Sequence, residues 1–197
     1  KSKFKFGLLL ESKFITKGLK EFCISNINIL KKEYNFIFTH DNDLLEKDSN
    51  LFKFCPANGT WISKPKIYHK NKLVSMISSN KNFTFGHKFR LNFINQYKDK
   101  LDLFGRGFNE IEYKEEGLKD YMFSICIENG NYECYFTEKI LDCFACGTIP
   151  VYYGTTKVSD FFDSKGIIFI DDNFNINNLT KSLYYSKINS VKYNFNL

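Results

Sequence analysis

Residues 122–154 read MFSICIENGNYECYFTEKILDCFACGTIPVYYG, and this stretch contains a complete strand–loop–helix–strand unit. Met122–Ile127 is almost uniformly apolar, as is typical of a strand that is buried on both faces of a sheet. Thr137 is a favourable N-cap for a helix with an apolar stripe, and Gly147 supplies its C-terminal stop. Thr148–Tyr153 then forms a second strand. The stretch therefore predicts a right-handed crossover between parallel strands.

Polar side chains gather where the first of these strands ends and the helix begins. They are Glu128, Asn129, Tyr135, Glu138 and Lys139. In parallel α/β sheets, ligands bind outside the carboxyl ends of the strands, and all of these residues belong to that edge. The sequence therefore predicts a ligand site at the head of this helix.

Strands and helices alternate regularly around this unit. The other expected elements are strands at 73–77, 101–104 and 167–170, helices at 86–97, near 157–163 and near 176–187, and a short helix at 118–121. Repeated units of this length are typical of an α/β fold with a doubly wound, mostly parallel sheet of the Rossmann type. We assign this sheet to a domain over residues 69–197.

The first part of the chain carries fewer elements. Strands are expected at 5–10 and 35–39 and a helix at 18–32, whereas residues 45–72 have weak periodicity and read as loop. Two strands and one helix cannot bury a full core by themselves. We therefore interpret residues 1–68 as a partial or minimal N-terminal α/β lobe.

The composition is that of a folded chain with an excess of lysine. Of its 197 residues 43% are hydrophobic, and the formal net charge is +6. Such a lysine excess is expected from an AT-rich coding sequence, so we discount it as evidence for nucleic-acid binding. Arg90 and Arg106 are the only arginines, and a guanidinium matches phosphate or carboxylate geometry better than lysine does. No apolar run approaches the about 20 residues that span a bilayer, and no signal peptide is visible, so we expect a cytoplasmic protein.

The cysteines raise the question of a metal or redox site. Cys143 and Cys146 form a CxxC, but both fall near the C-terminal end of the expected helix. A redox pair favours a helix N-terminus, where the dipole lowers the thiol pKa, and no second CxxC completes a zinc site. Small core residues are the better interpretation. The histidines are scattered, and we expect no metal site.

The charged residues near the helix head have two interpretations. The helix that begins after Thr137 offers backbone N–H groups and a positive dipole to a diphosphate, and Lys139 adds a full charge. Glu138 is better suited to accept hydrogen bonds from ribose or sugar hydroxyls. A plain capped helix with an acidic first turn explains the same residues. Arg90 could converge with Lys139 on one anion, depending on strand order, while Arg106 in a Gly-Arg-Gly turn is an outside candidate.

The segment from Phe123 to Gly154 closely resembles the donor-binding signature of family 10 glycosyltransferases, the α-1,3/α-1,4-fucosyltransferases. The resemblance covers most of residues 70–172. Its motifs are Ser78–Lys81, Arg90, Gly105–Gly107, Glu128-Asn129, Tyr135–Lys139 and Gly147–Gly154. It implies a GT-B arrangement of two Rossmann-like lobes and inverting transfer of fucose from GDP-fucose, without a bound metal or other cofactor. Residues 69–197 would then be the donor-binding domain and residues 1–68 the acceptor side.

The resemblance also implies roles for individual residues. Arg90 and Lys139 would hold the diphosphate of the donor. Asn129 and Glu138 would contact ribose or fucose hydroxyls, and Tyr135 would pack near the donor. These assignments agree with the independent placement of the residues at the carboxyl edge of the sheet.

Inverting transfer needs a carboxylate that deprotonates the acceptor hydroxyl as it attacks the anomeric carbon. In the family this base comes from the N-terminal lobe, shortly before a strand that resembles Tyr34–His40. Glu11, at the end of the strand expected at 5–10, matches that position best. Asp41 and Asp43 are the alternatives.

The resemblance implies an inverting fucosyltransferase whose partners are a GDP-sugar donor and an oligosaccharide or glycoconjugate acceptor. Association with a membrane surface through that acceptor is left open. One alternative is a transferase of the same fold that uses another nucleotide sugar. A second is a non-catalytic nucleotide- or glycan-binding fragment, which the short N-terminal lobe would explain. Nucleic-acid binding rests on the net charge alone.

Overall fold

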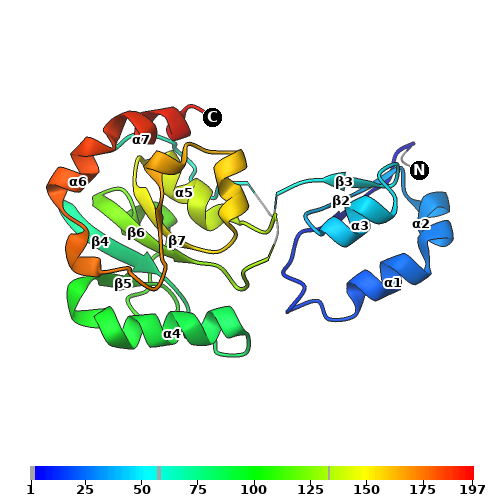
Figure 1. Ribbon diagram of the computed structural model, residues 1–197, viewed down its shortest axis with the longest axis horizontal. Helices are drawn as coiled ribbons and strands as arrows, with labels where there is room; N and C mark the ends of the chain where they lie inside the picture. Colours follow the sequence, from blue (N-terminus) through cyan, green and yellow to red (C-terminus); the bar gives the residue numbers. More distant parts are fainter. Residues whose placement is uncertain (1–2, 57–58, 133) are drawn as a thin grey trace.

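The computed structural model describes residues 3–56, 59–132 and 134–197, and it forms two α/β parts that lie side by side (Figure 1). Each part has its own parallel sheet. The first sheet is built from residues 6–54 and the second from residues 72–169. The predicted α/β fold class is therefore confirmed.

The first sheet is small and has the strand order β1-β2-β3. Its strands are β1 (Phe6–Leu9), β2 (Phe36–Thr39) and β3 (Phe52–Phe54), all parallel. Its helices are α1 (Leu19–Ser25), α2 (Ile27–Glu33) and α3 (Asn42–Lys47). Buried Cys23, Ile37, Leu44, Leu51 and Phe52 form the core between sheet and helices.

The first part contains more structure than the sequence predicts. The expected helix over 18–32 is divided at Asn26, whose φ of −113° and ψ of 20° leave the helical region. The sequence predicts loop over residues 45–72, which contain β3 and the end of α3. α3 begins because the Asp41 carboxylate accepts hydrogen bonds from the backbone N–H groups of Asp43 and Leu44.

The second sheet has five parallel strands among the described residues, in the order β5-β4-β6-β7-β8. They are β4 (Lys72–Ile77), β5 (Asp102–Phe104), β6 (Tyr121–Ile127), β7 (Ile149–Tyr153) and β8 (Ile168–Phe169). The chain winds outward in one direction from β4 to β5 and in the other from β6 to β8. This confirms the doubly wound sheet and places the topological switch point between β4 and β6.

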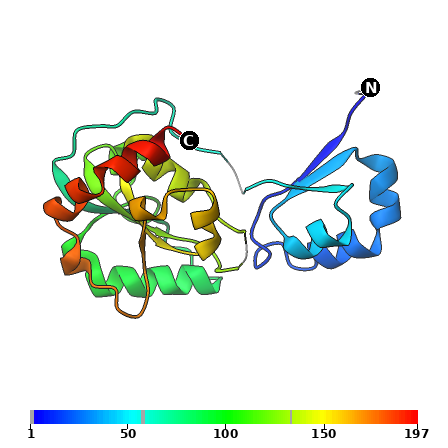
Figure 2. The same ribbon diagram turned by 45° about the horizontal axis from the view of Figure 1, so that its top comes forward.

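Helices cover both faces of the second sheet. They are α4 (Phe85–Tyr97), α5 (Glu138–Cys146), α6 (Lys181–Ser186) and α7 (Ile188–Phe195). Figures 1 and 2 show α4 on one face of the sheet and α5 on the other. Phe93 of α4 packs in one core cluster with Ile125, whereas Ile140 and Phe144 of α5 pack in another with Cys126. Successive side chains of β6 point to opposite faces of the sheet, so they pack in two different cores.

Several short elements differ from the sequence prediction. The helix expected at 118–121 is a 3₁₀ helix at Lys114–Gly117, because Tyr121 already pairs with Lys72 in the sheet. The helix expected near 157–163 is also 3₁₀, at Thr156–Asp160. The helix expected near 176–187 is a 3₁₀ turn followed by α6, and α7 is not predicted by the sequence.

The two parts meet through aromatic contacts. The ring centroids of Phe54 and Phe161 are 5.4 Å apart, and the Lys13 backbone N–H donates to the Tyr132 hydroxyl at 3.2 Å. The segment that joins the parts then runs along α5, where Lys66 N donates to Ala145 O at 2.8 Å. The domain division after residue 68 stays a prediction. No helix within the described residues is long and apolar enough to cross a membrane.

Candidate functional site

A pocket of about 500 Å³ lies at the switch point of the second sheet. The ends of β4 and β5, one face of β6 and the first turns of α5 surround it. Its polar lining includes Ser78, Ser79, Arg90, Arg106, Lys114, Glu138, Lys139 and Asp142. Arg90, Glu138 and Lys139 therefore converge from α4 and α5 on one pocket, at the edge where the sequence places them.

Arg90 reaches this edge from inside α4. It is buried, and its Nη2 donates to Ile127 O at 2.8 Å and to Asn129 Oδ1 at 2.9 Å. Burial lowers the pKa of Arg90, but a guanidinium stays charged in proteins. α4 can approach the end of β6 because residue 86 is glycine: a Cβ there would lie 2.2 Å from Glu128 O.

The side chain of Glu128, the residue after β6, lies at the start of α5. Its carboxylate is fully buried and accepts hydrogen bonds at 2.9 Å from both the backbone N–H and the hydroxyl of Thr137. Lys139 Nζ donates to the same carboxylate at 3.1 Å and to Thr137 Oγ1 at 2.8 Å. The sequence predicts a seat for a diphosphate at this helix start. Glu128 takes the N–H group of the N-cap residue Thr137, and the seat for a diphosphate at this helix start stays a prediction.

Two lysines flank Glu138 in the pocket. Lys114 Nζ lies 3.2 Å from Glu138 Oε1, and Lys139 Nζ lies 3.9 Å from the same oxygen. Burial acts to raise the pKa of Glu138, but Lys139 and Lys114 together hold it below its ordinary value. The carboxylate is therefore ionised at neutral pH and can accept hydrogen bonds from hydroxyl groups of a ligand.

Asn129 and Tyr135 stand outside this pocket lining. Asn129 is joined to it through its hydrogen bond to Arg90. Tyr135 is buried between the two parts of the molecule, with its ring centroid 4.9 Å from that of His40 and 4.7 Å from that of Tyr132. Burial raises the pKa of Tyr135. Its expected packing near a donor stays a prediction.

Glu11 lines a second hollow, of about 350 Å³, at the carboxyl edge of the first sheet. This hollow has no lining residue in common with the pocket beside α5. The Glu11 carboxylate accepts a hydrogen bond from the Ser12 backbone N–H at 2.8 Å, and after burial it helps to raise the pKa of Tyr132 to about 12. The alternatives are engaged in structure: Asp41 caps α3 and Asp43 pairs with Lys20. Within the part of the chain that the structure describes, Glu11 neither caps a helix nor forms an ion pair, in contrast to Asp41 and Asp43.

The cysteine pair packs in the core of the second part. Cys143 and Cys146 are buried on α5, and burial raises the pKa of Cys146 to about 12. Among the described residues no cysteine forms a disulfide bond and no cluster of metal-binding side chains occurs. The thiols therefore pack α5 against the sheet.

His40 makes stability depend on pH. Burial lowers its pKa to about 4, and its Nδ1 has no hydrogen-bond partner among the described residues. Between the ordinary pKa of 6.5 and about 4, the unfolded chain binds a proton that the folded chain refuses, so stability falls as the pH falls. We expect His40→Gln to reduce the loss of unfolding free energy between pH 7 and pH 4.5 by about 2–3 kcal/mol.

Denaturant titrations at both pH values measure this effect. His69→Gln is the matched control, since His69 is exposed. Equal pH dependence in the two variants would contradict the assignment to His40.

Sequence reasoning missed several residues at the pocket. Glu128 was placed at the correct edge without a role, and Lys114, Asp142 and Trp61 were not singled out. Asp142 lies one helical turn after Glu138, so an acidic pair on one face of α5 was a usable signal. Lys114 and Trp61 lie in segments without periodicity, where the sequence carries no such signal.

Comparison with known proteins bears directly on this pocket. The family description "Glycosyltransferase family 10 (fucosyltransferase) C-term" matches residues 67–195, which contain the second sheet and nearly all of the pocket lining. The chain belongs to glycosyltransferase family 10. The family resemblance expected from the sequence is therefore confirmed.

Named relatives in family 10 match shorter segments. The chain is 38% identical over 66 residues to an α-(1,3)-fucosyltransferase of Helicobacter pylori, covering 34% of this chain and 14% of that protein. It is 33% identical over 82 residues to a putative fucosyltransferase-like protein of Arabidopsis thaliana, covering 41% of this chain and 16% of that protein. The chain thus matches less than a fifth of the length of these relatives.

A solved structure of an α1,3-fucosyltransferase with GDP-fucose is also similar to this family 10 chain. The identity is 25% and the TM-score 0.50, over 64% of this chain and 39% of that one. The expected GT-B-like fold is confirmed in this sense: the chain corresponds to part of a fucosyltransferase structure of that class.

Proposed function

We propose that this chain transfers fucose from GDP-fucose to a hydroxyl group of a glycan acceptor, with inversion at the anomeric carbon. The observation that carries the proposal is the convergence of Arg90, Glu138 and Lys139 on one pocket at the switch point of the second sheet. Membership of family 10 and the likeness to a fucosyltransferase with GDP-fucose support the choice of donor.

The pocket residues suit the parts of a nucleoside diphosphate sugar. Arg90 and Lys139 bring positive charge from two helices and would bind the diphosphate, whose charge grows as it leaves. Glu138 is held ionised and would accept hydrogen bonds from ribose or fucose hydroxyls. Asn129, which accepts a hydrogen bond from Arg90, would also contact ribose or fucose hydroxyls. Tyr135 would pack beside the donor.

Glu11 would act as the general base. In the proposed step the acceptor oxygen attacks the anomeric carbon and the bond to the diphosphate breaks. The proton of the acceptor hydroxyl passes to the Glu11 carboxylate, and GDP leaves with the bonding electrons. A carboxylate in this role contributes about 10²- to 10⁴-fold to the rate.

A transfer assay tests the proposed function. The protein is incubated with GDP-fucose and a panel of glycan acceptors, and in parallel with GDP-mannose and UDP-sugars. We expect a fucosylated product from GDP-fucose alone. Transfer from another nucleotide sugar would overturn the donor assignment, and donor binding without hydrolysis or transfer would identify a non-catalytic binding fragment.

Lys139→Ala tests the diphosphate assignment. We expect GDP to bind about 1–3 kcal/mol more weakly, because a charged hydrogen bond to the diphosphate is lost. Calorimetric titration measures the difference. Lys157→Ala is the control, since Lys157 is exposed on the 3₁₀ helix at Thr156–Asp160 and its ion pair is solvated. Unchanged affinity in Lys139→Ala would remove Lys139 from the site.

A further inference from the structure

Trp61 is the single tryptophan of the chain, and it lines the pocket while its side chain stays 65% exposed. Its backbone is nevertheless firmly held. The Trp61 N–H donates to Asp142 Oδ1 at 2.7 Å, and the Thr60 hydroxyl donates to the same oxygen at 2.8 Å. Ile62 is buried against α5. The indole is therefore presented at a fixed place without being buried there.

Lys114 holds the ring in position. Its Nζ lies 4.6 Å from the centroid of the indole, within the range of a cation–π contact. The same ammonium lies 2.7 Å from Asp142 Oδ2 and 3.2 Å from Glu138 Oε1. Burial acts to lower the pKa of Lys114, but Glu138 and Asp142 hold it above its ordinary value, so the charge persists. Lys114 thus links Trp61 to Glu138, the residue that we expect to bind the ribose.

The order of these residues matches the order of groups in a nucleotide. Lys139 faces the expected diphosphate, and Glu138, its neighbour in α5, faces the expected ribose. Lys114 Nζ contacts both Glu138 and the Trp61 ring, so a chain of contacts runs from Lys139 through Glu138 and Lys114 to Trp61. The nucleobase is the group that continues beyond the ribose.

We propose that Trp61 is the stacking platform for the nucleobase of the donor, with Lys114 and Asp142 as its positioning residues. This inference rests on the proposed function. A flat, exposed indole offers its π-face to a base, and aromatic side chains stack with every type of base. Apolar Ile77, Ile111 and Leu118 in the same pocket provide further contact for the base.

Fluorescence and calorimetry with GDP test the proposal. Because Trp61 is the only tryptophan, the indole emission reports on this residue alone. We expect saturable quenching by GDP and none by inorganic pyrophosphate, which lacks the base. Trp61→Ala should weaken GDP binding between about 5-fold and about 100-fold, and Trp61→Phe should restore most of the affinity.

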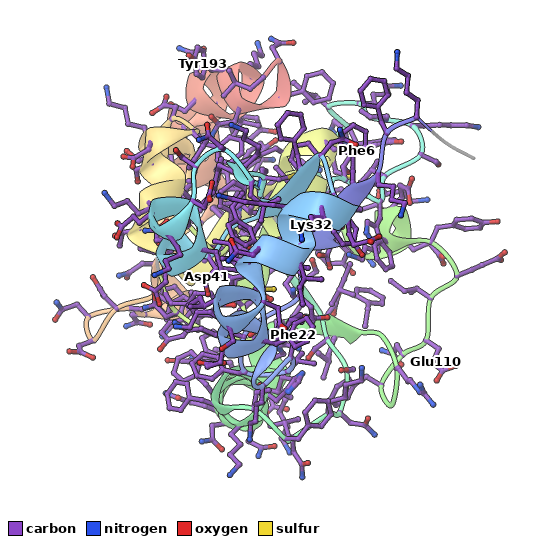
Figure 3. The ribbon with its side chains drawn as sticks, turned by 90° about the vertical axis from the view of Figure 1, so that its right-hand side faces the viewer. Phe6, Phe22, Lys32, Asp41, Glu110 and Tyr193 are labelled. Carbon is purple, nitrogen blue, oxygen red and sulfur yellow. The ribbon has the colours of Figure 1, made fainter. Side chains whose placement is uncertain are left out.

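Phe22→Ala is the control variant, since Phe22 is an exposed aromatic residue on α1 in the other part of the molecule (Figure 3). Circular dichroism establishes that each variant is folded. If the unmodified protein binds GDP while the emission is unchanged and Trp61→Ala keeps full affinity, the stacking proposal is wrong and the donor proposal stands. If the unmodified protein binds no GDP, the proposed function fails and this inference fails with it.

Discussion

Glu11→Gln is expected to lower the rate of fucose transfer by about 10²- to 10⁴-fold, the usual contribution of a general base. The amide keeps the shape of the side chain but cannot take the acceptor proton. GDP affinity should be unchanged, because the hollow that contains Glu11 and the pocket beside α5 have no lining residue in common. Initial rates with GDP-fucose and a glycan acceptor measure the first effect, and calorimetry measures the second.

Glu21→Gln is the matched control for this prediction. Glu21 lines the same hollow as Glu11 and is exposed on α1. Its variant should retain transfer. If Glu11→Gln also transfers at the full rate, Glu11 is not the base, and Asp41 and Asp43 become the carboxylates to test.

Glu128→Ala is expected to destabilise the fold by about 3–5 kcal/mol, as removal of one partner of a buried ion pair does. The Glu128 carboxylate is fully buried and accepts hydrogen bonds from Thr137 and Lys139 at the start of α5. Its removal leaves the Thr137 N–H without an acceptor and Lys139 without its anchor. We therefore also expect weaker GDP binding at temperatures where the variant remains folded.

Denaturant titration measures the stability change. Glu33→Ala is the control, because the pair between Glu33 and Lys5 is exposed and such surface pairs contribute about 0–1 kcal/mol. Glu128→Gln retains an oxygen acceptor for Thr137, so it should lie between the unmodified protein and Glu128→Ala. A free energy of unfolding in Glu128→Ala equal to that of Glu33→Ala would contradict the anchoring role.

The central unit of the second part could be predicted almost residue by residue because its signals are local. The apolar run from Met122 marks β6, the hydroxyl of Thr137 caps α5, and Gly147 ends it with a φ of +68°. Caps and hydrophobic periodicity act over a few residues, so the sequence alone contains them.

The contacts of the site could be predicted only in part because they join distant segments. Arg90 and Lys139 were expected to converge if the strand order allowed, and adjacency of β4 and β6 supplies that condition. The contacts from Lys114 to Glu138 and from Trp61 to Asp142 depend on tertiary packing of loops that have no periodic pattern. Residue identity at those positions carries no information about the partner.

The first part shows the same division between local and distant signals. β1 and β2 follow from apolar runs, whereas β3 is three residues long and forms because β2 is there to pair with it. Asp41 is a readable N-cap for α3, whereas the sequence analysis considers it only as an alternative base. Short elements that form only by pairing with an adjacent strand are therefore the ones that sequence analysis does not predict.

A calorimetric titration of the folded protein with GDP tests the central claim most directly, since it addresses the pocket formed by Arg90, Glu138 and Lys139 without requiring an acceptor. We predict saturable binding at one site per chain, with affinity for GDP that exceeds that for UDP. Absence of binding heat with GDP, in a sample whose circular dichroism is that of a folded α/β protein, would contradict the assignment of this pocket to the donor.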